Sequence, residues 1–462
     1  MSNINLSEYR RIHIVGIGGA GMSAIASVLK SMGFDISGSD VRRSHTLDRL
    51  EAQGIEVYLG HHANNILGSD LVTYSSAVPL GNVELLAAAS AGIEAVSRSE
   101  VLAAISKMKK SILIAGTHGK TTTTTMLGMI LAEAGLEPSL IVGGDVNEIG
   151  SNAIWGRGDY LVLEADESDG TFLKLDGKIA IVTSIEPDHL DFYGSFSSLV
   201  GAYQEFIDSA ETASIVCADD EVISSLQFER EGVFSYGFSE RADYRICNFS
   251  TSKSNIEFDV VFRNDLLGHI NLPVLGAHNA RNAAAAIAAS ILAGAKFSDI
   301  ATSLSRFAGV ARRFEFRGEA QGITFVDDYA HLPGEIKATL AAAKQLEPAR
   351  VVTVFQPHRY SRIATLANDF ASAFRDSDVT VITDIYPAGE KPLPGVTGEL
   401  VLNSVKDNFS GGQLYYHPSR ADLADFLKKI LRSGDLCLTL SAGDLSGLPE
   451  EILAGFKKEE TR

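Results

Sequence analysis

Short apolar runs that stop at glycine or polar residues recur along the chain, and helical patterns separate them. Residues 112–115 form one such run; a glycine loop follows, and then an amphipathic pattern continues to about Ala134. Residues 11–15, 160–163 and 179–182 are further runs of strand length. Strand-length apolar runs that alternate with helical patterns are typical of parallel sheets covered by helices. The sequence therefore predicts an α/β fold.

The length of the chain favours several domains, because 462 residues are too many for one hydrophobic core. We place a Rossmann-like domain at residues 1–107, a central domain of the P-loop ATPase type at 108–310, and a second Rossmann-like domain at 311–462. Alternating polar and apolar residues at 243–272 predict a small β-meander inside the central domain. The alanine-rich run at 282–295 is too short to span a bilayer and predicts a buried helix.

Composition narrows the classes of partner. The formal net charge of −18 disfavours nucleic acid and anionic membranes, since both attract faces rich in Lys and Arg. Cys217, Cys247 and Cys437 are odd in number and far apart, which fits neither a disulfide framework nor a metal cluster. No signal peptide is recognised, so we expect a cytoplasmic protein without membrane insertion.

Residues 116–122 form the most informative loop. They read Gly-Thr-His-Gly-Lys-Thr-Thr between a predicted strand and a predicted helix. In such loops backbone N–H groups surround nucleotide phosphates, the lysine contacts the outer phosphates, and a threonine hydroxyl reaches magnesium. The usual pattern has a glycine five residues before the Gly-Lys pair, where this chain has Ile114. We predict a shortened phosphate loop for ATP; an ordinary strand–turn–helix corner is the alternative.

Carboxylates gather where the next predicted strand ends. Residues 164–169 contain four of them, and bringing these charges together is costly without a cation. Magnesium bound to ATP would supply that cation and needs only one or two direct carboxylates. The alternative is a solvated acidic loop. His189 follows another buried run, so we expect it beside Glu164 if the sheet is parallel.

A second glycine-rich loop lies near the start of the chain. Residues 16–22 read Gly-Ile-Gly-Gly-Ala-Gly-Met after a predicted strand, and Asp40 follows about 20 positions later. This fingerprint predicts a site for a nucleotide diphosphate, with the acid on a ribose hydroxyl, and does not specify NAD. Ser75 and Ser76 follow a buried strand, where open sheets bind ligands, although turn formation explains them equally well. For His61, the role of a solvent-exposed turn residue is the alternative to a role in binding a ligand.

Polar residues also follow the strands of the last domain. Asp328, Tyr329 and His331 follow one strand, and Arg359 and Arg362 follow the next. Two arginines three positions apart can share one face and fork onto a carboxylate, with surface ion pairs as the alternative. A diphosphate site, an ATP site and a cationic site for a small acid together predict ATP-driven joining of two substrates.

Asn279 lies at the start of the predicted alanine-rich helix. Its amide donates and accepts hydrogen bonds as a pair, which suits an adenine edge. Capping the helix N-terminus is the alternative role.

The motifs together resemble the Mur ligases of peptidoglycan synthesis, and the resemblance covers essentially the whole chain. The matching stretches are residues 16–22 (GIGGAGM), 116–124 (GTHGKTTTT), 164–170 (EADESDG), 185–193 (IEPDHLDFY), 278–279 (HN), 309–315 (GVARRFE), 327–331 (DDYAH), 355–362 (FQPHRYSR) and 386–390 (YPAGE). The resemblance is strongest to members that join L-alanine to the lactyl carboxylate of UDP-N-acetylmuramate. It implies an acyl-phosphate intermediate and release of ADP and phosphate.

The resemblance also implies residue roles, with UDP-sugar bound by the first domain, ATP by the second and the amino acid by the third. ATP is assigned to Gly116, Thr117, His118, Gly119, Lys120, Thr121, Thr122, Asn279, Asn282, Arg313 and Asp328. Magnesium is assigned to Thr121, Glu164 and His189. UDP-sugar is assigned to Gly16, Gly18, Gly19, Gly21, Met22, Asp40, His61, Ser75 and Ser76. L-alanine is assigned to Tyr329, His331, Arg359 and Arg362. The implied catalytic residues are Lys120, Glu164, His189 and His331, the last as a base or a positioning group.

Three positions depart from the family pattern. Leu332 stands where a second histidine is usual, Gly334 where threonine is common, and Ser441 in a turn that is more often Gly-Ala-Gly-Asp. Leucine has no proton to transfer, so we expect no such role at position 332.

Other functions fit parts of the sequence. A nicotinamide dehydrogenase would explain the loop at 16–22 and Asp40 but not Lys120, and a nucleotide switch would use the phosphate loop without ligation. The start at 16–22 disfavours a related ligase that attaches a preformed peptide. The sequence does not rank alanine against glycine or serine, because a methyl-sized difference contributes only ~1–3 kcal/mol. It allows a monomer or a homodimer.

Overall fold

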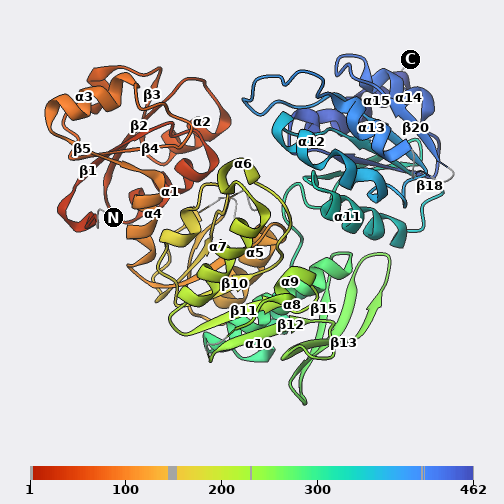
Figure 1. Ribbon diagram of the computed structural model, residues 1–462, viewed down its shortest axis with the longest axis horizontal. Coiled ribbons are helices and arrows are strands. Elements are labelled where there is room, and N and C mark those ends of the chain that lie inside the picture. The colour runs from red at the N-terminus through yellow and green to blue at the C-terminus, as the bar shows by residue number, and fades with distance from the viewer. Residues whose placement is uncertain (1–3, 144–152, 229–230, 407–408, 410–411, 461–462) are drawn as a thin grey trace.

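The computed structural model describes residues 4–143, 153–228, 231–406, 409 and 412–460. Its described strands form three sheets, of five, ten and six strands, whose members fall within residues 11–97, 110–272 and 315–440. Each sheet forms the centre of one lobe (Figure 1). The predicted α/β class with three domains is confirmed.

The N-terminal sheet has the order β3-β2-β1-β4-β5, and all its pairings are parallel. The glycine loop at residues 16–22 follows β1, and Asp40 ends the neighbouring strand β2. Its strands are β1 (Arg11–Val15), β2 (Asp35–Asp40), β3 (Glu56–Leu59), β4 (Leu71–Tyr74) and β5 (Glu94–Ser97). Its helices are α1 (Ala20–Ser31), α2 (His45–Ala52), α3 (Val83–Ala91) and α4 (Arg98–Ser106), with short 3₁₀ turns η1 (Leu6–Glu8) and η2 (Ala63–Ile66).

The central sheet has the order β15-β14-β13-β12-β11-β10-β6-β9-β7-β8. It is parallel from β13 to β7, and β13, β14 and β15 continue it as the predicted antiparallel meander. Its strands are β6 (Lys110–Ala115), β7 (Ser139–Ile141), β8 (Ala153–Ile154), β9 (Tyr160–Glu164), β10 (Ile179–Val182), β11 (Ala213–Cys217), β12 (Val233–Gly237), β13 (Tyr244–Thr251), β14 (Ile256–Phe262) and β15 (Asp265–Leu272). Its helices are α5 (Lys120–Glu133), α6 (Leu190–Tyr193), α7 (Phe196–Ser209), α8 (Glu221–Ser225), α9 (Ala277–Leu292), α10 (Phe297–Leu304) and η3 (Thr171–Lys174).

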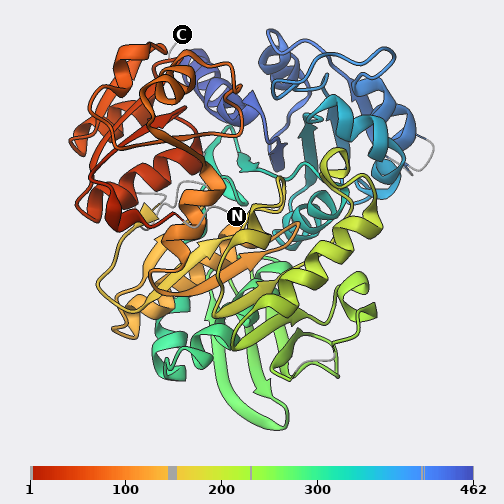
Figure 2. The same cartoon turned by 60° about the vertical axis from the view of Figure 1, so that its left-hand side comes forward.

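The C-terminal sheet has the order β16-β17-β21-β18-β19-β20, and only its edge pair β16–β17 is antiparallel among the described strands. Its strands are β16 (Glu315–Ala320), β17 (Ile323–Asp328), β18 (Arg350–Phe355), β19 (Val379–Ile382), β20 (Gln413–Tyr416) and β21 (Asp435–Leu440). Its helices are α11 (Pro333–Gln345), α12 (Tyr360–Leu366), α13 (Gly398–Lys406), α14 (Leu423–Ile430), α15 (Leu448–Glu460), η4 (Ala367–Ser372) and η5 (Asp444–Gly447). The N- and C-terminal domains lie side by side above the central domain (Figure 2).

The alanine-rich segment forms α9, which packs closely against α5 of the phosphate loop. Residues 283–289 are fully buried, as predicted, and small side chains let the two helices approach. The N-cap interpretation of Asn279 is wrong. Gly276 is the N-cap residue, and Asn279 lies within the first turn, where its Nδ2 donates to the Leu275 carbonyl at 2.8 Å.

Among the described residues, every helix is too short or too polar to cross a membrane.

Candidate active site

The phosphate loop connects β6 to α5 and is closely packed. Gly116 has φ 135° and Gly119 φ 77°. A Cβ at Gly116 would lie 2.1 Å from Thr183 Oγ1, and one at Gly119 would lie 2.4 Å from Asn282 Oδ1. Both positions therefore require glycine for conformation and for space. The loop leads into the start of α5, where the helix macrodipole favours an anion.

Lys120 already has anionic and dipolar partners. Its Nζ lies 2.7 Å from Glu167 Oε1 and also donates to the Gly116 carbonyl. Burial opposes the positive charge, but the carboxylates of Glu167 and Glu164 raise the pKa of Lys120 above its usual value. The lysine is therefore charged at neutral pH and faces the loop that we expect to hold phosphates.

The acidic strand end is balanced by protein cations, which the sequence interpretation did not include. Arg98, from the N-terminal domain, places Nη2 3.0 Å from Asp166 Oδ2 and 3.1 Å from Asp169 Oδ2. Burial opposes ionisation of Asp166, but hydrogen bonds from Ser168 and the Arg98 charge hold its pKa at about 2. The solvated-loop alternative is wrong, because Glu167 is buried and both aspartates are only partly exposed.

Thr121 and Glu164 meet at the foot of the phosphate loop. Thr121 Oγ1 donates to the Glu164 carboxylate at 3.1 Å, and Glu164 Oε2 accepts from the Gly143 N–H at 2.8 Å. Glu164 and His189 do not follow neighbouring strands, because β6 runs between β9 and β10, and His189 Nε2 lies 3.3 Å from Asp188 Oδ2. That His189 lies beside Glu164 stays a prediction.

His118 lies between two carboxylates. Its Nε2 is 3.2 Å from Glu186 Oε2, and its Nδ1 is 3.2 Å from Glu335 Oε1 of the C-terminal domain. Burial disfavours the imidazolium, but Glu335 and Glu186 together raise the pKa of His118 to about 10. The phosphate loop therefore carries a second fixed cation beside Lys120.

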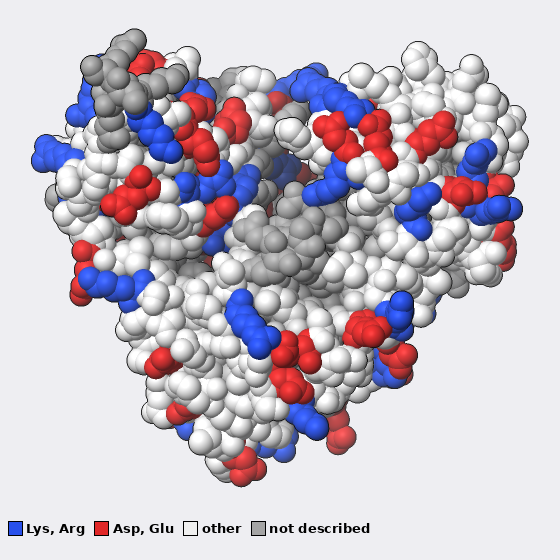
Figure 3. Space-filling model, turned by 180° about the vertical axis from the view of Figure 1, so that it is seen from behind, with Lys and Arg blue, Asp and Glu red and all other residues white. Residues whose placement is uncertain are grey.

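One cavity of about 730 Å³ opens where the three domains meet. It receives Gly21 and Arg98 from the first domain, Lys120 and Glu164 from the second, and His331 from the third. Figure 3 shows the face opposite that of Figure 1, hollowed between the N- and C-terminal lobes, with Lys and Arg side chains in the hollow. Residues far apart in sequence thus share one reaction space. Thr121, His189, Arg313, Tyr329, Arg359 and Arg362 also line it.

A second cavity of about 500 Å³ adjoins the phosphate loop between the central and C-terminal domains. Asn279, Asn282, Arg313 and Asp328 all line it, together with Thr122. Asn282 Nδ2 donates to Asn279 Oδ1 at 3.3 Å. Burial raises the pKa of Asp328 to about 6, while its oxygens accept the N–H groups of Phe314 and Ala330 at 2.7 Å. The cavity has the polar lining and size of a nucleoside site.

His331 is a neutral imidazole whose tautomer follows from its partners. Burial lowers the pKa of His331 to about 4 despite the nearby Glu335. Its Nδ1 lies 3.0 Å from the Tyr329 carbonyl and 3.2 Å from Glu335 Oε2, and both are acceptors. We therefore assign the proton to Nδ1, which leaves the Nε2 lone pair unprotonated.

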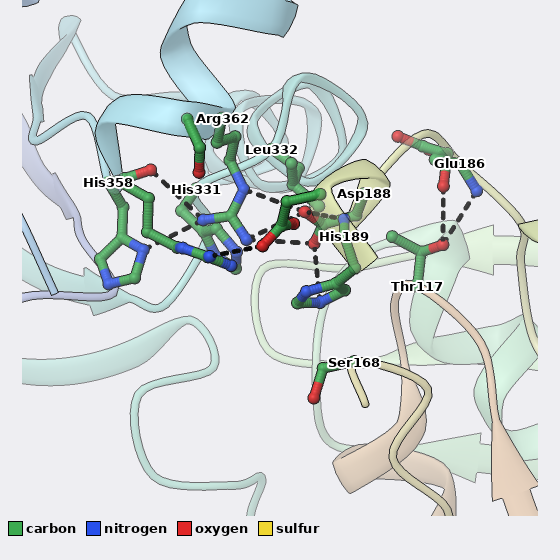
Figure 4. Close-up of polar contacts among 12 residues, drawn as sticks. Thr117, Ser168, Glu186, Asp188, His189, His331, Leu332, His358 and Arg362 are labelled. Carbon is green, nitrogen blue, oxygen red and sulfur yellow. Dashed lines mark hydrogen bonds and ion pairs between the residues drawn. The ribbon is translucent and has the colours of Figure 1, made fainter. Parts of the chain in front are cut away.

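Arg359 and Arg362 pair with separate protein carboxylates, from the central domain and the β19–α13 loop, and only Arg362 contacts both oxygens of one. That both arginines fork onto one carboxylate of a small acid stays a prediction. Arg362 binds both oxygens of Asp188 at 3.1 Å, as Figure 4 shows beside His331 and His358. Arg359 contacts Glu390 at 2.7 Å and Asp191 at 3.2 Å. The surface-pair alternative is wrong for Arg362, which is buried. The two pairs with Asp188 and Asp191 connect the C-terminal domain to the central one.

In the N-terminal domain, Asp40 shapes the glycine loop. Its Oδ2 accepts the Gly18 N–H at 2.9 Å, and a Cβ at Gly18 would lie 2.8 Å from the same oxygen. Gly16 has φ 78° at the end of β1, and a Cβ at Gly19 would meet only the Gly16 carbonyl, at 3.6 Å. Met22, at 1% exposure, packs in the hydrophobic core rather than lining the cleft.

His61 belongs to a buried polar network, so the exposed-turn alternative is wrong. Its Nδ1 lies 2.9 Å from Ser39 Oγ and 3.2 Å from Glu84 Oε2. Burial opposes ionisation of Glu84, but the nearby His13 ring and hydrogen bonds from Ser39 and Asn65 hold its pKa at about 2. Ser75 Oγ accepts the Ala77 N–H at 3.3 Å, as a turn residue does, and Ser76 is exposed.

Comparisons with known proteins agree with this arrangement. Residues 11–110 match the Mur ligase family catalytic domain, residues 114–290 the Mur ligase middle domain, and residues 312–443 the glutamate ligase domain of Mur ligases. A UDP-N-acetylmuramate–L-alanine ligase from Desulfosudis oleivorans is 44% identical over 97% of this chain and 98% of its own length. The chain belongs to the Mur ligase family. A Pelotomaculum thermopropionicum relative of the same name is 41% identical over 98% of this chain and 99% of its own.

Solved structures of other Mur ligases have the same domain arrangement. A UDP-N-acetylmuramate–alanine ligase from Thermotoga maritima superposes with a TM-score of 0.82 at 28% identity, over 97% of this chain and 99% of its own. A murein peptide ligase from Psychrobacter arcticus shares the fold, with a TM-score of 0.71 at 24% identity, over 97% and 98% of the two chains.

Arg98 and Glu335 are among the residues at the site of this Mur ligase that escaped the sequence interpretation. Arg98 begins α4, where the helix dipole disfavours a cation, and this mismatch could have drawn attention to it. Glu335 lies two residues after Pro333, the first residue of α11, where an acidic residue commonly caps the start of a helix. This capping role accounts for a glutamate at the position, so the sequence did not indicate a second role.

Proposed function

We propose that this Mur ligase joins L-alanine to the lactyl carboxylate of UDP-N-acetylmuramate, using ATP and releasing ADP and phosphate. Residues 1–107 would bind the UDP-sugar, residues 108–310 ATP, and residues 311–462 the amino acid. The free thiols of Cys217, Cys247 and Cys437 are consistent with a reducing compartment, and we place the reaction in the cytoplasm.

The observation that carries the proposal is the cavity shared by the three domains. A ligase that uses three substrates needs their reacting groups within a few ångströms of one another. Only a space that reaches the glycine loop at Gly21, the phosphate loop at Lys120 and the amino-acid side at His331 meets this need. A dehydrogenase or a nucleotide switch would require no such junction.

In the first step the lactyl carboxylate attacks the γ-phosphorus of ATP, and ADP leaves. Phosphoryl transfer depends on positioning and on neutralising charge. Lys120 and the His118 imidazolium supply fixed positive charge at the loop, and the start of α5 directs backbone N–H groups at the phosphates. The products are an acyl phosphate and ADP.

In the second step the alanine amine attacks the acyl carbon, and phosphate leaves as the amide forms. The amine must lose a proton, and the free Nε2 of His331 can accept it or hold the amine in place. Arg359 and Arg362 lie at the same end of the cavity, where a carboxylate of the amino acid could bind.

The residues at the phosphate loop fit magnesium. Thr121 and Glu164 offer adjacent hydroxyl and carboxylate oxygens, the donors that this ion prefers, whereas His189 is the weaker candidate by chemistry. Within the described residues no group of three or more His, Cys, Asp or Glu side chains is arranged for a metal. When bound, the ion would neutralise phosphate charge.

An ADP-release assay with an amino-acid panel tests the proposal. ADP should appear only when ATP, UDP-N-acetylmuramate and L-alanine are all present, with glycine and L-serine as competitors that differ by small groups. Equal turnover without the UDP-sugar or without any amino acid would show that the assignment is wrong.

The variant Lys120→Ala tests the role of the phosphate loop in the same assay. It should reduce turnover at least 100-fold, because the variant loses the positive charge that Lys120 would place at the phosphates. Binding of UDP-N-acetylmuramate, measured by calorimetry, should not change, since its proposed domain is separate. Loss of both properties would indicate a misfolded protein or a wrong domain assignment.

A further inference from the structure

Glu335 uses its two carboxylate oxygens for different tasks. Oε2 accepts the N–H groups of His331 at 2.9 Å and Leu332 at 3.3 Å, and so fixes the loop that precedes α11. Oε1 points the other way, 3.2 Å from His118 Nδ1 and 3.3 Å from Arg313 Nη1. One buried side chain thus connects the amino-acid loop to the phosphate loop.

The phosphate-loop side of this contact is equally constrained. The backbone N–H of His118 donates to Ser184 Oγ at 3.0 Å, and Glu186 holds the opposite ring nitrogen. Figure 4 shows Glu186 bound in turn to Thr117 of the same loop, where its N–H meets Thr117 Oγ1 at 2.8 Å. His118 therefore lies between two carboxylates and presents Nδ1 to the C-terminal domain.

Gly334 explains how α11 comes so near. A Cβ at this position would lie 2.2 Å from Glu186 Oε1. The departure from the common threonine thus leaves room for the first turn of α11 to lie directly against the central domain, with Glu335 one residue further on.

We propose that Glu335 is a positioning residue that docks the C-terminal domain onto the phosphate loop through His118. The contact fixes the position of the loop of Tyr329 and His331 relative to the ATP phosphates. The inference rests on the ligase activity proposed above and goes beyond it, because it assigns the alignment of two substrates to one ion pair between domains.

Glu335→Gln is the direct test. A glutamine can keep its oxygen on the N–H groups of His331 and Leu332, but its NH₂ group then faces the donor Arg313, and it carries no negative charge to attract the His118 imidazolium. The loop cap should survive while docking is lost. We expect the KM for L-alanine to rise and kcat to fall, each at least 10-fold, with the affinity for UDP-N-acetylmuramate unchanged.

Measuring KM and kcat separately distinguishes a positioning role of Glu335 from a loss of folded protein. A smaller folded fraction would lower kcat and leave every KM unchanged, and that result would overturn the proposal. Glu451→Gln is the matched control, because Glu451 pairs with Arg420 on the exposed surface of the same domain. It should change neither constant. A wild-type protein without turnover would refute the ligase assignment itself, which is a distinguishable outcome.

Two substitutions of His118 test the same contact from the other side, even if Glu335→Gln does not fold. The asparagine NH₂ group can take the place of Nδ1, which faces Glu335, and the glutamine NH₂ group that of Nε2, which faces Glu186. His118→Asn should therefore keep the KM for L-alanine within about 3-fold, whereas His118→Gln should raise it at least 10-fold. The reverse order, or equal effects, would overturn the proposal.

Discussion

At the scale of single residues, the site is defined by histidines whose protonation differs according to their neighbours. His118, between Glu186 and Glu335, has a pKa raised to about 10, whereas burial lowers the pKa of His331 to about 4 and that of His358 to about 3. Residue type alone gives the same ordinary pKa for all three. The arrangement thus places a cation in the phosphate loop and a neutral imidazole at the C-terminal side of the shared cavity.

The raised pKa of His118 predicts a loss of stability in alkali. A group that binds its proton more tightly when folded stabilises the protein fully below its unfolded pKa, near 6.5. This stabilisation is lost as the pH rises through about 10. The wild-type thermal midpoint should fall between pH 7 and 9.5 by on the order of 2–4 °C more than that of His118→Gln, which does not titrate.

The groups that face His118 determine this outcome. Glu186 and Glu335 raise its pKa, while Arg313 and His278 lie nearby, and burial lowers the pKa of His278 to about 4. His278 is therefore neutral throughout the window and does not contribute to it. Parallel pH profiles of the wild type and His118→Gln, measured by differential scanning calorimetry, would contradict the assigned charge.

At the scale of elements, the strands were predictable because apolar runs of strand length are buried on both faces of a parallel sheet. The position of the phosphate loop was predictable as well, because the loop connects the buried strand β6 to the helix α5. The start of α9 was not. Asn279 has the residue type of an N-cap, but the backbone turns at Gly276, with φ 92°, three residues earlier. Which of several polar residues caps a helix depends on the preceding loop.

Helix α9 should tolerate no enlargement of its side chains. Ala288 is 0% exposed, and the helix packs against α5 and strands of the central sheet. Ala288→Leu should destabilise the central domain by about 1–3 kcal/mol, because the close packing leaves no space. Chemical denaturation should therefore show an earlier transition. Ala89→Leu, on the exposed side of α3, is the control, and an equal shift in both variants would contradict the packing argument.

At the scale of the whole molecule, contacts between domains were the least predictable feature. Arg98 and Asp166 are separated by 68 positions, and Arg362 and Asp188 by 174. The sequence indicated that Asp166 and Arg362 follow strands, but it did not single out Arg98, which also lines the cavity. Which opposite charges meet depends on how the three lobes are oriented, and no local pattern records that orientation.

Arg98 should control how the N-terminal domain closes on the central one. It is 17% exposed, and a Cβ at Gly21 would lie 2.9 Å from its Nη1, so it lies between the glycine loop and the acidic strand end. Arg98→Gln leaves Asp166 and Asp169 without their shared cation, and their repulsion then opposes closure. Small-angle X-ray scattering should show a larger radius of gyration, and kcat/KM for UDP-N-acetylmuramate should fall at least 10-fold.

Two further variants separate closure from general charge effects. Arg98→Lys keeps one charge but loses the planar fork, so it should lie between the wild type and Arg98→Gln. Arg43→Gln removes a cation whose partners, Asp48 and Glu51, lie in its own domain, and it should leave the scattering curve unchanged. If the curves of Arg98→Gln and wild type superimpose at equal activity, the Arg98 ion pairs do not hold the domains together. If Arg98→Gln expands while Arg43→Gln does not, one arginine links the proposed UDP-sugar domain to the strand end that also contacts Lys120.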